Sequence, residues 1–91
     1  MKNSDTMFHG KGVRKYRVIL SADCARSGWH LYVNADNAQA CMAYAKAFDI
    51  FRVMTREQYG EFCKEEGSAP YVTEIFDMTS REEVYHYMYG F

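Results

Sequence analysis

The chain has 91 residues, a net charge of −1 and 48% hydrophobic residues, a composition typical of one folded domain. No apolar run approaches the ~18 residues of a membrane span, and the first residues lack the apolar core of a signal peptide. We therefore expect a cytoplasmic protein with no membrane partner. Three cysteines, an odd number at wide spacing, favour reduced thiols over a disulfide framework.

Charge is divided unevenly along the chain. Residues 1–53 carry a net charge of +4, whereas residues 54–91 carry −5. Such polarity can orient a charged partner, although two ordinary helices with acidic first turns would produce the same pattern.

Residues 1–12 are expected to form a flexible N-terminal arm, followed by a single domain over residues 13–91. Residues 15–21 and 29–34 each alternate apolar and polar side chains, as half-buried strands do. The linker between them is polar and ends in a glycine, which favours a hairpin. The inward side chains of the second strand should be Trp29, Leu31 and Val33.

The next segment has the features of a helix. Asp36 is followed three residues later by Gln39, a pattern that predicts a helix start. Apolar residues lie almost all round this helix, with Ala40, Ala43, Tyr44 and Ala47 on one face and Cys41, Met42, Ala45 and Phe48 on the other. Such a helix is expected to be buried or covered by a partner.

Two later stretches, IFRVMTREQYGEF from Ile50 and IFDMTSREEVYHY from Ile75, have almost the same wording. In each, Thr55 or Ser80 opens a Ser/Thr-x-x-Glu/Gln capping box, and apolar residues follow at helical spacing. The repetition therefore indicates two similar pieces of scaffold and no catalytic motif.

A β-rich run precedes each capping box, at residues 49–54 and 71–78, although the first run could instead be the end of the preceding helix. Gly67 and Gly90 stand where the two helices should stop. The order of elements is then β-β-α-β-α-β-α. This order predicts an α+β fold with a mixed sheet of about four strands and three helices.

Metal and catalytic sites find little support in the sequence. Structural zinc needs converging ligands with pairs two to four residues apart, and no two Cys or His residues have that spacing, so we expect no metal and no cofactor. Cys24 is the one cysteine in a predicted loop, with Arg26 and His30 near it in sequence. A minimal enzyme with this cysteine as nucleophile is therefore an alternative.

Nucleic-acid or phosphate-ligand binding is a second alternative. It would use the basic cluster Lys11, Arg14, Lys15 and Arg17, with Tyr32 on the outward face of the hairpin for base stacking. The segment HGKGVRK lacks the spacing of a phosphate-binding loop and precedes a strand, where such a loop opens a helix. A pI near 6.3 also argues against nucleic acid as the main ligand.

Aromatic residues gather at the C-terminal end, where VYHYMYGF holds four in eight positions. On a helix beginning at Ser80, Arg81, Tyr85 and Tyr89 would form an exposed stripe, and Arg and Tyr are enriched at binding hot spots. Alternatively, Tyr85 and Tyr89 cover the edge of the core with their hydroxyls in water. The residues predicted to bind a partner are Arg81, Tyr85, Tyr89, Phe91, Glu61 and Glu65.

These features favour a small non-enzymatic protein-binding module, a stoichiometric inhibitor or adaptor of a larger protein or complex. Inhibitors carried by phages and other mobile elements, such as anti-CRISPR proteins, share this size and composition, which is a likeness of profile only. A homodimer could use the same aromatic surface.

Overall fold

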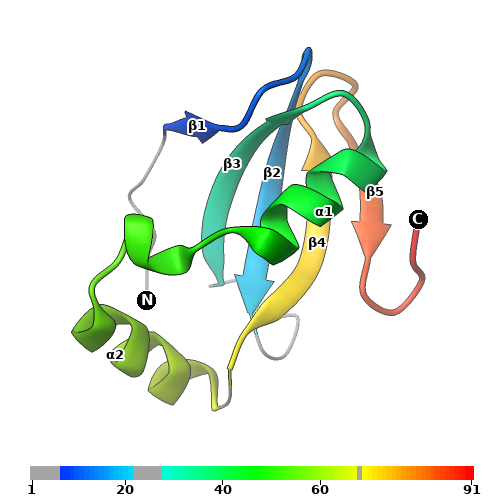
Figure 1. Ribbon diagram of the computed structural model, residues 1–91. Helices are drawn as coiled ribbons and strands as arrows, with labels where there is room; N and C mark the ends of the chain where they lie inside the picture. Colours follow the sequence, from blue (N-terminus) through cyan, green and yellow to red (C-terminus); the bar gives the residue numbers. More distant parts are fainter. Residues whose placement is uncertain (1–6, 22–27, 68) are drawn as a thin grey trace.

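Five strands form one mixed sheet, and helix α1 lies across one face of it (Figure 1). The computed structural model describes residues 7–21, 28–67 and 69–91. The strands are β1 (Phe8–His9), β2 (Arg14–Ser21), β3 (Trp29–Ala35), β4 (Tyr71–Asp77) and β5 (Glu82–His86). The helices are α1 (Ala38–Ala47), the 3₁₀ helix η1 (Ile50–Arg52) and α2 (Arg56–Glu66).

The strands are ordered β1-β3-β2-β4-β5 in the sheet. Strand β1 is parallel to β3, and all other neighbours are antiparallel. This arrangement confirms the predicted α+β class with a mixed sheet. The described residues form five strands and two α-helices, in place of the predicted four and three.

Strands β2 and β3 form the predicted hairpin. Tyr16 pairs with Val33, and Val18 pairs with Leu31, so these four side chains lie on one face of the sheet. All four are buried, and so is Trp29, which confirms the predicted inward side chains of β3. Each large apolar side chain buried in this way contributes roughly 1.5–3 kcal/mol to the free energy of unfolding.

Helix α1 begins one residue later than predicted. Its N-cap is Asn37, whose side-chain oxygen accepts the backbone N–H of Ala40 at 2.8 Å. The carboxylate of Asp36, the predicted cap, accepts the backbone N–H of Val13 at 3.2 Å instead. The helix buries Cys41, Met42 and Ala45, whereas Ala40, Ala43 and Ala47 of the other predicted face are exposed.

Residues 49–54 were predicted as a strand, and this prediction is wrong because they contain the 3₁₀ helix η1. The carboxylate of Asp49 accepts the backbone N–H of Phe51 at 3.1 Å and so begins the turn. Met54 at the end of the segment is buried in the core. Ile50 and Val53 also pack against the core, so the segment is a connection between the two helices held by apolar contacts.

Helix α2 begins and ends as predicted. The hydroxyl of Thr55 accepts the backbone N–H of Gln58 at 3.1 Å, and the Gln58 side chain accepts the backbone N–H of Thr55 at 2.8 Å. Gly67 ends the helix with φ 86°, a conformation that glycine adopts without steric cost. Phe62 is fully buried, so α2, at the lower left of Figure 1, joins the same core as α1.

Residues 80–90 were predicted as a third helix, and this prediction is wrong because they form a turn, β5 and a C-terminal turn. The carboxylate of Asp77 accepts the backbone N–H groups of Thr79 and Ser80 at 2.9 and 3.1 Å. Arg81 takes a left-handed conformation (φ 63°) and donates its N–H to the Asp77 carbonyl at 2.7 Å. These bonds turn the chain back along β4, so Ser80 caps no helix.

The sheet also includes part of the segment that the sequence assigned to a flexible arm. Phe8 and His9 form β1 and pair with Tyr32 and Val33 of β3. His9 is buried, and its ring centroid lies 5.0 Å from that of Phe48. The first six residues lie outside the described part of the chain.

Candidate functional site

The C-terminal segment forms an exposed aromatic surface beside β5, at the right of Figure 1. After β5 the chain turns back, and His86 and Gly90 exchange backbone hydrogen bonds, from His86 N–H at 3.2 Å and from Gly90 N–H at 2.7 Å. We call the resulting surface the aromatic edge. Its members are Tyr71, Tyr85, Tyr87, Met88, Tyr89 and Phe91.

The aromatic edge is largely open to solvent. Tyr89 is 80% exposed, Met88 63% and Phe91 58%. The rings of Tyr71 and Tyr87 contact each other with centroids 5.7 Å apart, and those of Tyr85 and Phe91 are 5.0 Å apart.

Tyr85 and His86 hold the exposed side chains of the aromatic edge in place. Tyr85 is half-buried and packs against the core, as the alternative interpretation of this residue proposed. The Nδ1 atom of His86 accepts the backbone N–H of Met88 at 3.1 Å, and its ring lies 5.1 Å from those of Tyr87 and Tyr89. The exposed side chains therefore stand on an ordered turn.

The predicted partner-binding residues do not all meet at this surface. Tyr85, Tyr89 and Phe91 belong to it, although on a strand and a turn instead of a helical stripe. Arg81 lies in the turn at the opposite end of β5. Glu61 and Glu65 are exposed on α2, on the opposite side of the molecule in Figure 1.

Three members of the edge were missed. The stripe predicted on a helix was Arg81, Tyr85 and Tyr89, which leaves out Tyr87 and Met88, and Tyr71 was assigned only to a strand. Residues 82–87 are rich in Val and Tyr, which favour strands, and this propensity was the available signal.

Acidic side chains lie next to the edge. Glu82 and Glu83 are exposed on β5, and Glu83 lies close enough to Glu74 of β4 to affect its titration. Burial and the charge of Glu83 both raise the pKa of Glu74, whereas Arg17, with an N–O distance of 3.9 Å, lowers it. The surface around β5 is thus aromatic and acidic.

The predicted basic cluster is divided between two faces of the sheet. Arg14 points to the face that carries α1, where its Nη2 atom lies 2.8 Å from the Asp77 carboxylate. The alternation of β2 sends Lys15 and Arg17 to the opposite face, where Arg17 lies beside Tyr32, its partner on β3. Lys15 lies over Phe8 on that same face.

The remaining member of the basic cluster, Lys11, is exposed in the connection between β1 and β2. Its neighbour Gly12 packs directly on the backbone of Ala35. A Cβ atom at position 12 would lie only 2.3 Å from the Ala35 Cα, so a larger residue does not fit there. Close packing thus accounts for this glycine of HGKGVRK without a bound phosphate.

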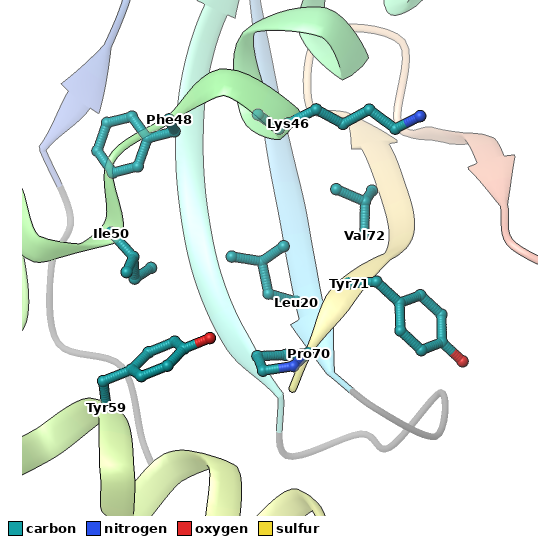
Figure 2. A pocket seen from close by; sticks show the side chains of 9 residues that line it. Leu20, Lys46, Phe48, Ile50, Tyr59, Pro70, Tyr71 and Val72 are labelled. Carbon is teal, nitrogen blue, oxygen red and sulfur yellow. The ribbon is translucent and has the colours of Figure 1, made fainter. Parts of the chain in front are cut away.

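An apolar cleft of about 350 Å³ lies between α1, α2 and the start of β4 (Figure 2). Its apolar walls include Leu20, Phe48, Ile50, Pro70 and Val72. The Tyr59 hydroxyl points into it and Lys46 lies at its rim, whereas the Tyr71 ring points away, toward the aromatic edge. None of its described lining residues is a cysteine, histidine or carboxylate.

The structure describes only some of the candidates for catalysis and metal binding. Cys24 and Arg26 lie outside the described residues, so the nucleophile hypothesis stays a prediction. Burial raises the pKa of the Cys41 thiol to about 12, and burial followed by the charge of Arg17 lowers the pKa of His30. In the described part of the chain, no three His, Cys, Asp or Glu side chains are placed to hold a metal ion.

Comparison of the chain with protein-family models, curated proteins and solved structures gives no match. The described α-helices, of ten and eleven residues, are also too short to cross a bilayer. Inferences about function therefore rest on the surfaces of the molecule itself.

Proposed function

We propose that the protein is a small binding module that docks on a larger protein through the aromatic edge. The observation that carries this proposal is the grouping of exposed Tyr, Phe and Met side chains on one ordered turn. Exposed apolar patches of this kind mark interaction sites, and aromatic residues supply much of the binding energy at interfaces.

The edge is preorganised for binding. The bridge between His86 and Gly90 fixes the backbone, and the ring contact between Tyr85 and Phe91 orients the last side chain. Because these groups are ordered before the partner arrives, less conformational entropy is lost on association. Tyr and Phe lose few torsions when they are buried, which adds to the same advantage.

The charge around the edge defines the chemistry of the partner. Glu74 pairs with His86 at the edge and Glu83 lies two residues before Tyr85 on β5, so a complementary surface has an apolar pocket with basic residues at its rim. Charged side chains on an outer strand also discourage pairing with a foreign strand. We therefore expect contact through side chains and not through extension of the sheet.

A role as a stoichiometric inhibitor or adaptor fits this mode of binding, because it needs only that the partner surface be occupied. The apolar cleft adjoins the edge at Tyr71 and offers space for an apolar side chain of the partner. A second copy of the chain is the competing occupant of the same surface.

The test compares wild type with a Tyr89→Ser/Phe91→Ser double variant. Proteins retained from source cells are identified by mass spectrometry, and the candidate is then purified and titrated with each variant by calorimetry. We expect a one-to-one complex that the double variant weakens at least about 10-fold.

The control is Val13→Ser, which removes an apolar side chain that is 85% exposed outside the edge. It should leave the affinity unchanged, and thermal unfolding should show that all variants are folded. Equal affinity of wild type and the double variant would contradict the proposal, as would sedimentation showing that only copies of the chain associate.

A further inference from the structure

The face of the sheet opposite α1 carries a row of aromatic and cationic side chains. The register places Phe8, Tyr32, Arg17 and Phe76 side by side on the neighbouring strands β1, β3, β2 and β4. Tyr16 and Val18 point toward the core, so Arg17 between them points to the opposite face. We call these residues the open-face row, because they lie on the face of the sheet opposite the one that α1 covers (Figure 1).

Cations and rings meet in pairs along the row. The guanidinium carbon of Arg17 lies 4.9 Å from the centroid of the Phe76 ring, and the Lys15 Nζ lies 4.8 Å from that of Phe8. The Phe8 and Tyr32 rings are themselves 5.3 Å apart. The side chains of the row are partly exposed, so a flat ligand can reach the rings.

Arg17 has hydrogen-bonding capacity that the described residues leave unused. Its Nε atom is buried without a hydrogen-bond partner among them. Its Nη2 atom is 3.9 Å from the Glu74 carboxylate, which is beyond hydrogen-bonding distance. Because the Arg17 side chain is 32% exposed, its guanidinium can also donate to an anionic ligand on this face.

We infer that the open-face row binds single-stranded nucleic acid. Unpaired bases stack on the rings of Tyr32, Phe76 and Phe8, and the phosphates meet Lys15 and Arg17. A single strand fits better than a duplex, because its bases are free to stack on a flat face.

The charged side chains also determine where the phosphates of the nucleic acid lie on this face. Glu83 pairs with Phe76 at the β5 end of the row, and Glu74 lies beside it on β4. These carboxylates repel phosphate, whereas Lys15 and Arg17 attract it. The phosphates therefore lie nearest Lys15 and Arg17, away from the carboxylates at the β5 end of the row.

The experiment is a fluorescence anisotropy titration of the full chain with a labelled 12-nucleotide uridine or thymidine oligonucleotide at several salt concentrations. Wild type should bind the single strand better than the matching duplex. Tyr32→Leu and Phe76→Leu should each weaken binding about 5-fold or more. Lys15→Gln should lower the slope of log affinity against log salt by about one.

Arg56→Gln is the matched control, because Arg56 also lies over a ring, 4.3 Å from the centroid of Phe51, but outside the row. It should bind as wild type does, and Glu83→Gln should bind more tightly. Lys15 is exposed, so its variant tests the inference even if a variant of the half-buried row unfolds.

Three results would overturn the inference. The first is no binding by wild type at low salt, and the second is equal affinity for duplex and single strand. The third is an equal loss of affinity in Arg56→Gln and Lys15→Gln, which would indicate attraction by charge alone.

Discussion

The start of α2 and the turn between β4 and β5 have nearly the same residues but opposite outcomes. At the first, Thr55 and Gln58 exchange two hydrogen bonds and a helix follows. At the second, the equivalent Ser80 donates its backbone N–H to Asp77, and a strand follows. The hydrogen bonds of Asp77, three positions before Ser80, therefore accompany the reversal of the chain.

The physical reason is competition for backbone N–H groups. A capping residue works by accepting the free N–H groups of a first helical turn. In a capping box at Ser80, the Glu83 side chain would accept the backbone N–H of Ser80. Here the Asp77 carboxylate accepts that N–H and that of Thr79, and the Asp77 carbonyl accepts that of Arg81. The residues after this turn favour strands, whereas those after Thr55 include Glu, Gln and Lys, which favour helices.

The largest effect is expected from Asp77→Ala. The change removes both hydrogen bonds to the turn and the pair with Arg14, so the free energy of unfolding should fall by about 3 kcal/mol. Urea denaturation measures it. Asp49→Ala, which removes a single bond to the N–H of Phe51, should cost about 1 kcal/mol or less. Similar losses in both variants would contradict the central role of Asp77.

The contribution of the Asp77 carboxylate to stability should decrease at acidic pH. Burial alone would raise the pKa of Asp77, but the bonds from Arg14, Ser80 and Thr79 outweigh it and hold the pKa below its ordinary value of 3.8. A lowered pKa contributes stability that is complete above that ordinary value and is lost as the pH falls toward the folded-state value. The gap in unfolding free energy between wild type and Asp77→Asn should therefore shrink below about pH 4. A gap that stays constant would show that the charge of Asp77 contributes nothing.

Alanine substitutions at the matched positions Thr55 and Ser80 should change the free energy of unfolding by different amounts. Thr55→Ala removes a helix cap and should lower the free energy of unfolding by about 1 kcal/mol. Ser80→Ala leaves the backbone bond to Asp77 intact and should change it by less than about 0.5 kcal/mol. Equal losses at the two positions, measured by urea denaturation, would show that Ser80 also acts through its hydroxyl.

The smallest expected effect is that glycine substitutions at Arg81 and Arg56 change the free energy of unfolding in opposite directions. Arg81 has φ 63°, so Arg81→Gly should relieve strain and stabilise the protein by about 0.5 kcal/mol. Arg56 occupies the matching position in the first turn of α2, and Arg56→Gly should destabilise it by a similar amount. Thermal unfolding midpoints should move in opposite directions, and a shift in the same direction would contradict the difference in backbone conformation.

Sequence patterns were reliable where one local signal had no competitor. The alternation of β2 and β3 predicted the hairpin and its buried face, and Thr55 with Gly67 predicted both ends of α2. The third helix could not be excluded in this way, because the capping signal of Ser80 is overridden by a side chain outside the motif.

The candidate surfaces were harder to predict than the elements. Tyr85, Tyr89 and Phe91 were assigned to one surface and lie together, but their role in binding stays a prediction. The open-face row depends on strand order. Phe76 lies beside Arg17 only because β4 enters the sheet next to β2, and neighbours distant in sequence leave no local pattern.

The central place of β2 also governs how the chain folds. β2 meets β3 across a short connection, but Thr73 of β4 donates its hydroxyl hydrogen to the carbonyl of Ile19, 54 positions away. Closing so long a loop costs entropy before any contact forms, so we expect the hairpin to assemble early and β4 to dock late. Amide hydrogens of β2, the central strand of the sheet, should exchange with solvent most slowly, and those of the outer strands β1 and β5 fastest.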